Sequence, residues 1–533
     1  MAGSITAAQL RDRLRAGGEL AIVDAREEGS FHDRHLLMAS CLPLSRLELL
    51  APGLLPRRSA PIVVCDDNDT SPWGERLAER AAARLTAGGY TDVSVLAGGV
   101  AAWDAAGYPL YSGVHVPSKA FAEVVEHESG TPWISAEELA ERQQRGEKLA
   151  VFDSRSYEEY HSNSIPGAIS VPGAELVYRF NELVPSPDIF VVVNCGGRTR
   201  SIIGAQSLID AGVPNRVVSL KDGTMAWHLA GLGVVAGATG RAPEVSTDGI
   251  AAARQRADAV ARRYGVAVID RATLAQWQRE ADRRTLYVLD VREPAEYRAG
   301  HLQGSVMAPG GQLVQETDRW LGVWGARVVL VDDTGVRARM TAAWLKRMGW
   351  DAAVLEGGPS GVELEQGMPV IHTDIFPLAG PEPTTIQATE LQAEQGVVVD
   401  LALSRNHRAG HIPGAWYAIR ARLAEALDKL PEAGELVLTS EDGAIARYAA
   451  AELDTRRRVK VLAGGTAAWR AAGLPLDTGM GPLASEPDDV AVSARDRPPA
   501  ERERYMREYL AWEVDLVNQI ARDSDCRFRL VPA

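Results

Sequence analysis

The sequence predicts an α/β protein of four tandem domains, each a parallel sheet with helices on both faces. A short apolar strand that ends in aspartate occurs four times, at Asp24, Asp153, Asp290 and Asp400. Each copy continues with a second β-rich run, a stretch of helical period, and a strand that closes in a glycine turn. Strands that alternate with helices are typical of a parallel sheet covered on both faces.

The distance between the recurring aspartates indicates that each copy is a domain and not a short solenoid repeat. Successive copies lie roughly 110 to 140 residues apart, which is an ordinary domain length. We therefore expect four domains, a helix between the second and the third, and a C-terminal extension. The expected bounds are 1–115, 130–237, 266–375 and 382–478 for the domains, 248–265 for the helix, and 479–533 for the linker and C-terminal helix.

Shifts in composition mark the connections between the copies. Residues 112–132 and 237–247 resemble loops, and the polar, proline-bearing stretch after Thr478 is typical of a flexible linker. The last part of the chain has apolar residues at helical spacing, which favours a helix that docks on the domains over one that binds a partner. These residues are Tyr505, Tyr509, Trp512, Val514, Leu516 and Ile520.

Charge and cysteine usage exclude several classes of protein. The net charge is −14, which argues against a general nucleic-acid surface or an anionic membrane surface. No apolar run approaches the roughly 20 residues of a membrane span, and the first residues lack the apolar core of a signal peptide. The four cysteines are scattered without CxxC pairs or zinc spacing, so we expect a cytoplasmic protein with reduced thiols.

One cysteine occupies a place that the other three copies fill differently. In the second copy, the strand of residues 191–194 runs into Cys195 and the sequence CGGRTRS. The register of the repeats puts Asp66, Asp332 and Ser440 at the same place in the first, third and fourth copies. A thiol therefore ends this strand in the second copy alone, and we expect the other three copies to be inactive.

The residues after Cys195 suit an ionised sulfur. A thiol becomes a good nucleophile when it ionises, and its pKa falls beside cations or at a helix N-terminus. The backbone amides of the following loop are expected to curl round the sulfur, and a helix that begins near Ser201 adds the positive end of its dipole. Arg198 and Arg200 supply charge for an anionic substrate. A buried structural cysteine is the alternative, but it would not call for two glycines and two arginines.

Four motifs in fixed order resemble the rhodanese-type sulfurtransferase family. They are the strand end Asp153-Ser-Arg155, SIPGAI at 164–169, CGGRTRS at 195–201 and DGTMAW at 222–227. The resemblance extends over all four copies, almost to residue 478. It implies that each copy is a doubly wound, rhodanese-like domain.

The resemblance also implies a chemistry for the second domain. Cys195 would take the outer sulfur of thiosulfate or of a persulfide donor, hold it as a persulfide, and pass it to a thiol or to cyanide. The implied partners are a small anionic sulfur donor and a thiol or protein persulfide acceptor, with no metal and no organic cofactor; homo-oligomer formation stays open. The implied substrate-binding residues are Gly196, Gly197, Arg198, Thr199, Arg200 and Ser201, with Asp153 and Arg155 bracing the loop.

Two other functions compete with this one. A rhodanese-like fold also hosts some cysteine phosphatases, but their loop places the cysteine and the anion-binding arginine six positions apart. Here Arg200 follows Cys195 by five positions, and the shorter loop suits sulfur better than phosphate. The second alternative is a non-catalytic scaffold or regulatory binding protein, which suits the three copies without the thiol. Cys65, one place before Asp66, is expected to be a buried strand cysteine, and its reactivity stays open.

Overall fold

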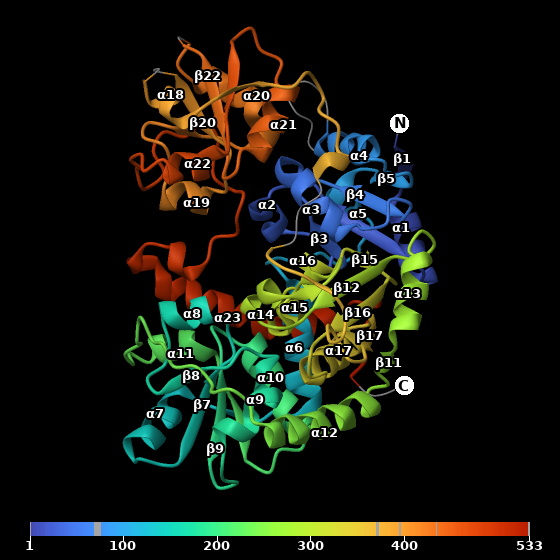
Figure 1. Cartoon of the computed structure of the whole chain (residues 1–533), viewed down its shortest axis with the longest axis vertical. Helices are drawn as coiled ribbons and strands as arrows, with labels where there is room; N and C mark the ends of the chain where they lie inside the picture. Colours follow the sequence, from blue (N-terminus) through green and yellow to red (C-terminus); the bar gives the residue numbers. More distant parts are fainter. Residues whose placement is uncertain (1, 69–75, 369–372, 394–395, 433, 531–533) are drawn as a thin grey trace.

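The computed structural model describes residues 2–68, 76–368, 373–393, 396–432 and 434–530. It contains four sheets of mainly parallel strands flanked by helices, so the predicted fold class is confirmed (Figure 1). Domain 4 (orange) lies at one end of the molecule beside domain 1 (blue), and domains 2 (teal) and 3 (yellow-green) form the other end. Along the described part of the chain, no helix combines the length and the apolar character that crossing a bilayer requires.

Domain 2 shows the strand order that the other domains repeat. Its order is β6-β10-β9-β7-β8, and every neighbouring pair is parallel. Strand β9 is buried along its whole length, as its run of Phe and Val predicts for a sheet covered on both faces. The strands are β6 (Trp133–Ile134), β7 (Leu149–Asp153), β8 (Ala168–Ser170), β9 (Phe190–Asn194) and β10 (Val217–Leu220). The helices are α7 (Ala136–Gln144), α8 (Tyr157–Ser162), α9 (Glu175–Leu183), α10 (Thr199–Asp210) and α11 (Gly223–Leu229).

Domains 1 and 4 follow the same plan. The strands of domain 1 are β1 (Gly3–Ile5), β2 (Leu20–Asp24), β3 (Ala39–Cys41), β4 (Ile62–Cys65) and β5 (Val93–Leu96), and its helices are α1 (Ala7–Ala16), α2 (Glu28–Asp33), α3 (Leu47–Leu54), α4 (Leu77–Ala87) and α5 (Gly99–Ala105). The strands of domain 4 are β19 (Thr384–Ile386), β20 (Val397–Asp400), β21 (Trp416–Tyr417), β22 (Leu436–Thr439) and β23 (Val459–Leu462), and its helices are α18 (Ala388–Ala393), α19 (Ser404–Ala409), α20 (Leu423–Ala426), α21 (Ala444–Glu452) and α22 (Gly465–Ala471).

Domain 3 repeats the plan and adds three short strands. Its main strands are β11 (Ala267–Ile269), β12 (Leu286–Asp290), β14 (Val306–Met307), β16 (Arg327–Val331) and β17 (Asp351–Leu355), and its helices are α13 (Arg271–Arg279), α14 (Pro294–Ala299), α15 (Gly310–Gln315), α16 (Thr317–Trp320) and α17 (Val336–Arg347). The additional strands are β13 (His301–Leu302), its antiparallel partner β18 (Leu364–Glu365), and β15 (Val323–Trp324).

The domains share hydrophobic cores, so they are not packed as separate units. Strand β15 of domain 3 pairs antiparallel with β2 of domain 1, with Val323 opposite Ala21. One cluster of buried apolar side chains continues from domain 1 through this contact into domain 3. A second cluster joins domain 2 to α17 of domain 3 through helix α12 (Thr247–Arg263), which lies between the second and third domains. Domain 3 is therefore packed against both of its predecessors.

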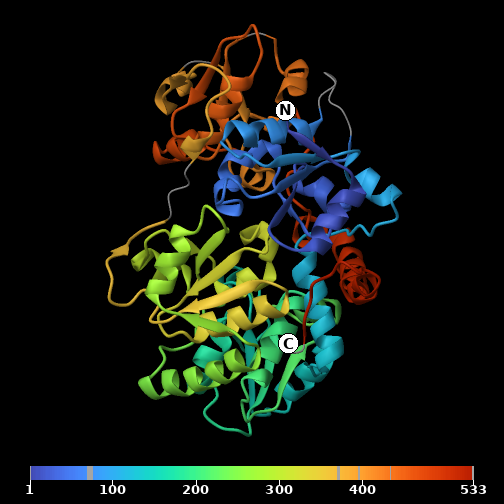
Figure 2. The same ribbon diagram turned by 90° about the vertical axis from the view of Figure 1, so that its right-hand side faces the viewer.

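The segment between domains 1 and 2 differs from its prediction. Residues 112–132 were expected to be a loop, but Val116–Ser129 form helix α6, with Pro117 in its first turn. Its apolar side chains Val116, Ala120, Phe121 and Val125 lie at positions i, i+4, i+5 and i+9, on one face of the helix, and are fully buried. The helix packs against α10 of domain 2, and Figure 2 shows it (cyan-blue) beside the red C-terminal helix.

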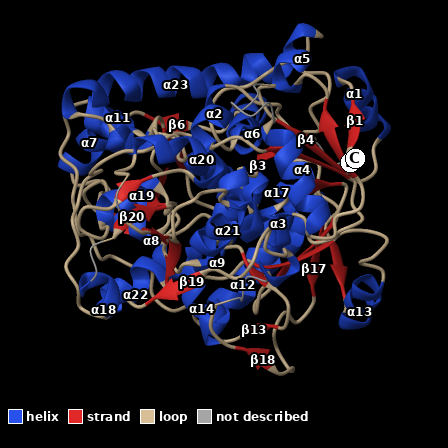
Figure 3. Ribbon diagram, turned by 90° about the horizontal axis from the view of Figure 1, so that it is seen from above, coloured by secondary structure: helices blue, strands red, loops and turns tan. Residues whose placement is uncertain are grey.

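The C-terminal extension is bound to the domains along its length. The stretch after Thr478 was expected to be a flexible linker, but it is held by backbone bonds: Tyr417 N–H donates to the carbonyl of Pro482 at 2.9 Å, and Gly29 N–H donates to that of Asp488 at 2.7 Å. We call residues 479–498 the strap. The predicted final helix is α23 (Pro499–Ala521), which packs against α6 and spans one side of the molecule (Figure 3). Leu516 is buried in that contact, whereas Val514 is exposed.

Candidate active site

Cys195 lies where strand β9 ends, at the carboxyl edge of the domain 2 sheet. In α/β sheets this edge is where ligands bind, because successive strands and helices leave a crevice there. The loop runs from Cys195 to Arg198, and α10 begins at Thr199, two residues earlier than the sequence indicated. The first amides of α10 therefore point toward the loop, with the positive end of the helix dipole.

A glycine of the next turn fixes the path of this loop. Gly223 has φ +54°, and a Cβ there would lie 2.3 Å from the carbonyl oxygen of Cys195. Thr224 N–H donates to that same oxygen at 2.8 Å, and Met225 N–H donates to the carbonyl of Gly196 at 3.1 Å. The geometry of loop and turn thus depends on a residue without a side chain in a left-handed conformation.

The thiol of Cys195 is nearly buried, with 2% of its surface exposed. Its Sγ lies 3.5 Å from the hydroxyl of Ser201, which itself donates to the carbonyl of Arg198 at 2.8 Å. Burial raises the pKa of Cys195 above its usual value, while Arg200 and hydrogen bonding from Ser201 act to lower it. The loop was expected to lower this pKa, and its cation and hydroxyl do act in that direction, but burial outweighs them.

Arg200 lies across the loop from helix α8. It donates to both carboxylate oxygens of Glu159, at 2.6 and 2.8 Å, and to the side chain of Gln312 from domain 3 at 3.0 Å. Burial alone would raise the pKa of Glu159, but Arg200 lowers it to about 2. Arg200 is thus a fixed cation near the sulfur, and its role in substrate binding stays a prediction.

Arg198 is held by three carboxylates. Its guanidinium donates to Glu123 of α6 at 2.7 and 2.8 Å and to Asp222 at 2.8 Å, and it also pairs with Glu126. Arg198 and Glu123 are both almost completely buried. The guanidinium therefore connects α6 to the loop. An anionic substrate, the predicted ligand of Arg198, would have to compete with these carboxylates for it.

Asp153 and Arg155 form a buried pair behind the loop. Arg155 donates to the Asp153 carboxylate at 2.8 and 2.7 Å, and Asn194 donates to the same carboxylate at 3.3 Å. The same aspartate–arginine pair occurs in domains 1 and 3, which have no thiol at the loop. In domain 4, His407 takes the place of the arginine and lies 2.7 Å from Asp400. The pair therefore belongs to the fold, although Arg155 also lines the cavity described next.

A cavity of about 290 Å³ opens in front of the Cys195 loop. Its floor is the six consecutive residues from Cys195 to Arg200, whereas Ser201 contacts the sulfur without lining the cavity. Its opposite wall comes from outside domain 2: Gln315 of domain 3, residues 493–495 of the strap, and Tyr509 and Glu513 of α23. Thus the C-terminal extension completes the pocket of the second domain.

Glu513 brings a buried carboxyl group to the loop. Its Oε1 accepts from the hydroxyl of Thr199 at 2.7 Å, and its Oε2 is buried without a hydrogen-bond partner among the described residues. A Cβ on Gly197 would lie 3.2 Å from that Oε2. Burial raises the pKa of Glu513, and Lys119 and Thr199 act to lower it.

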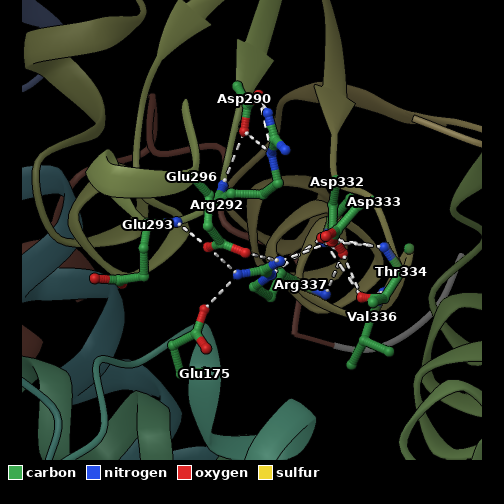
Figure 4. A network of polar contacts seen from close by, with 12 residues as sticks. Glu175, Asp290, Arg292, Glu293, Glu296, Asp332, Asp333, Thr334, Val336 and Arg337 are labelled. Carbon is green, nitrogen blue, oxygen red and sulfur yellow. Dashed lines mark hydrogen bonds and ion pairs between the residues drawn. The ribbon is translucent and has the colours of Figure 1, made fainter. Parts of the chain in front are cut away.

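The corresponding loops of domains 1 and 3 are filled by their own side chains. Asp332 accepts from the amide and guanidinium of Arg337, at 2.9 and 3.0 Å, and Arg337 continues to Glu175 of domain 2 and to Glu296 (Figure 4). In domain 1, Asp66 accepts from the amides of Asn68 and Ala78, both at 2.9 Å, and pairs with Arg76. In each of these two loops the carboxylate thus accepts from the backbone amides that would otherwise be free to bind an anion. In domain 4, Ser440 accepts from the amide of Ala446 at 3.4 Å.

Several site residues could not be assigned from sequence. Glu123 lies in the segment taken for a loop, and Glu159 and Glu513 are acidic residues without a recognisable motif. A signal existed for Glu123, since the apolar residues round it have helical spacing and follow a proline. Thr199 and Ser201, expected to bind substrate or cap the helix, lie in the first turn of α10 and bond to Glu513 and to the carbonyl of Arg198, and their role in substrate binding stays a prediction.

Comparisons with known proteins agree with the fold. The family model described as the rhodanese-like domain matches residues 6–106, 135–230, 271–365 and 385–472. The crystal structure of a thiosulfate sulfurtransferase from Pseudomonas aeruginosa superposes with a TM-score of 0.94 and 47% identity, covering 99% of this chain and 100% of that one.

Curated relatives match single domains. A sulfurtransferase of Allochromatium vinosum is 31% identical over 103 residues, which are 19% of this chain and 94% of the relative. An HTH-type transcriptional regulator of Mycobacterium tuberculosis is 39% identical over 105 residues, which are 20% of this chain and 45% of the relative, so the chain spans less than half of that protein. Because the family model covers most of the chain, and a sulfurtransferase aligns with it end to end, the chain belongs to the rhodanese-like family.

Proposed function

We propose that this chain transfers sulfane sulfur through a persulfide on Cys195. The observation that carries the proposal is the contrast between the four loops. Cys195 is a thiol at the floor of an open cavity, whereas carboxylates fill the loops of domains 1 and 3 and a hydroxyl stands in domain 4. A carboxylate or hydroxyl cannot form a persulfide, so sulfur transfer rests on domain 2.

The chemistry has two steps, with thiosulfate as the proposed donor. The Cys195 thiol loses its proton to water, and the thiolate attacks the outer sulfur of thiosulfate. The new bond joins that sulfur to Cys195, the sulfur–sulfur bond of thiosulfate breaks, and sulfite leaves with the electron pair. In the second step, cyanide or a thiolate attacks the outer sulfur of the persulfide, and Cys195 leaves as the thiolate.

The loop favours the anionic form of the persulfide. Its amides, the start of α10 and the cation of Arg200 all present positive charge where the outer sulfur would lie. The amide six residues after the loop position donates to Asp332 in domain 3 and to Ser440 in domain 4, at 3.4 Å in each case, and in domain 2 that amide belongs to Ser201. Because the loop amides of domain 3 bind a carboxylate, we expect those of domain 2 to bind the anionic persulfide on Cys195.

The test is thiocyanate formation from thiosulfate and cyanide, measured at varied concentrations of both. We expect parallel double-reciprocal lines, because the two substrates react in separate steps, and we expect Cys195→Ser to abolish activity. Cys65→Ser is the matched control, because Cys65 is a completely buried strand cysteine of domain 1. Equal activity in the Cys195→Ser variant, or no turnover by the wild type with thiosulfate or with a persulfide donor, would overturn the proposal.

A further inference from the structure

A second cavity adjoins the pocket of Cys195. Its volume is about 370 Å³, and it lies between α6, the strap and α23. Three aromatic side chains of α23 line it, namely Tyr505, Tyr509 and Trp512, together with Val492 of the strap. We call it the aromatic cavity. It shares Met225, Ser493, Ala494 and Tyr509 with the Cys195 pocket, so the two spaces are direct neighbours.

One cation lines the aromatic cavity without an anionic partner. Lys119 of α6 is 6% exposed, and its ammonium group lies 5.2 Å from the ring centres of both Tyr509 and Trp512. Among the residues that the structure describes, it has no ion pair and no side-chain hydrogen bond. Burial lowers its pKa, and the nearest acidic groups act on it only through space. A buried ammonium group of this kind is costly unless an anion accompanies it.

Two of the neighbouring acidic groups are already engaged by other side chains. Asp318 lies 2.9 Å from the imidazole of His115, and Glu316 pairs with Arg319 at 3.0 Å. The third, Glu513, accepts from Thr199 through Oε1; its Oε2 has no hydrogen-bond partner among the described residues, and the carboxyl group raises the pKa of Lys119 through space without a direct ion pair. The other titratable groups that line the cavity are Tyr505 and Tyr509, whose pKa values burial raises, His32, whose pKa burial lowers, and Glu508, which is exposed. Lys119 is therefore the group through which the cavity would hold an anion.

The chemistry of the cavity differs from that of the sulfur pocket beside it. Thiosulfate has no apolar part, so it gains nothing from three aromatic rings. A cavity of this size, mostly apolar with one fixed charge, is typical of a site for an organic ligand. An organic thiol with a carboxylate would place its methylene groups on the rings and its carboxylate on Lys119, with the sulfur directed to the shared boundary near Tyr509.

We propose that the aromatic cavity binds the organic part of a small, carboxylate-bearing thiol that serves as the sulfur acceptor. The proposal rests on the function proposed above. The thiol loses its proton to water, and its thiolate attacks the outer sulfur of the Cys195 persulfide. A new sulfur–sulfur bond forms on the acceptor, the bond to Cys195 breaks, and Cys195 leaves with the electron pair. The product is the persulfide of the acceptor.

The test compares two acceptors that differ in charge. The protein is loaded with thiosulfate, excess donor is removed, and loss of the persulfide is timed with 3-mercaptopropionate and with its uncharged analogue 3-mercaptopropanol, each rate being corrected for the thiolate fraction. We expect a preference for the carboxylate, and we expect Lys119→Met to reduce that preference about tenfold because a charge-assisted contact is lost. Lys148→Met is the control, since Lys148 is an exposed lysine of domain 2, outside the cavity.

A binding measurement separates this proposal from the previous one. The S-methyl ether of 3-mercaptopropionate cannot react, so its affinity can be titrated whether or not Cys195 accepts sulfur. We expect Lys119→Met, but not Lys148→Met, to weaken its binding about tenfold. If the protein takes up no sulfur but Lys119→Met binds the ether more weakly than Lys148→Met does, the sulfur-transfer proposal fails and ligand binding in the aromatic cavity is supported. If Lys119→Met alters neither the acceptor preference nor the binding of the ether, the cavity proposal is wrong.

Discussion

The most informative substitution in the loop is Arg198→Met, because the sequence and the structure suggest different roles for Arg198. The sequence predicts a cation for the substrate, whereas the structure shows a clamp between α6 and the loop. In the clamp, Arg198 makes two bonds to Glu123, at 2.7 and 2.8 Å, and both side chains are 3% exposed. Asp222 and Glu126 are its more exposed partners.

The size of the effect follows from this burial. Removing one partner of a buried ion pair costs about 3–5 kcal/mol, because the other charge stays buried and unpaired. Each of the two more exposed pairs adds less than about 1 kcal/mol. We therefore expect the free energy of local opening round α6 and α10 to fall by about 3–5 kcal/mol, which corresponds to roughly 100- to 4,000-fold faster amide exchange.

The effect should also depend on pH. Burial raises the pKa of Glu123 from its ordinary value of 4.5 to about 7, even though Arg198 acts to lower it. Without Arg198 that pKa rises further. A carboxyl group whose pKa is raised by folding destabilises the fold once the pH exceeds its unfolded value, and the penalty grows until the pH passes its folded value. The loss in Arg198→Met should therefore be small near pH 4.5 and largest above pH 7.

Hydrogen exchange followed by mass spectrometry of peptides from α6 and α10 measures this loss directly. Arg145→Met is the control, because Arg145 is an exposed arginine of the same domain, and little change is expected there. If Arg198→Met exchanged like the wild type while the KM for thiosulfate rose strongly, Arg198 would be a substrate ligand and the clamp interpretation would be refuted.

Two further substitutions test the walls of the pocket. Glu513→Gln removes a charge that contributes to the raised pKa of Cys195, so we expect faster alkylation of Cys195 by iodoacetamide at a pH below the pKa of the thiol; an unchanged rate would contradict this. Gly223→Ala places a Cβ 2.3 Å from the carbonyl oxygen of Cys195. This clash adds to the roughly 1–2 kcal/mol that alanine costs in a left-handed backbone conformation, so we expect sulfur loading to fail. Gly231→Ala has the same backbone cost in open space and should load normally; equal loading by both variants would argue against the contact.

The repeats made the fold predictable from sequence. Four copies of one pattern reinforce each other, so the Asp-ended strands, the loop and the closing glycine turn could be placed without a structure. The register was also recoverable. The turn glycines Gly99, Gly223, Gly358 and Gly465 each lie against the carbonyl of the loop residue in their own domain, so Asp66, Cys195, Asp332 and Ser440 occupy one place.

The packing between domains was not predictable in the same way. Apolar residues at helical spacing show that one face of a helix is buried, but they do not show which part of the protein covers that face. Strand β15 joins the sheet of domain 1 although it belongs to domain 3, and Phe121 of α6 packs against Trp344 of domain 3. Both are contacts between segments that are distant in sequence.

For the same reason, only part of the site was predicted. The residues from Cys195 to Ser201 are consecutive, so a motif identifies them together. Glu123, Lys119 and Glu513 reach the site from α6 and α23, and the local sequence marks at most their helices, not their place in the site. Their role depends on where two helices dock, which the sequence shows only as apolar faces.

The most direct test of the central claim is the intact mass of the protein after incubation with thiosulfate, before and after cyanide. The account predicts that the wild type gains one sulfur atom, that cyanide removes it as thiocyanate, and that the Cys195→Ser variant gains none. A gain of sulfur by Cys195→Ser, or an unchanged mass of the wild type with thiosulfate and with a persulfide donor, would contradict the assignment of Cys195 as the sulfur carrier.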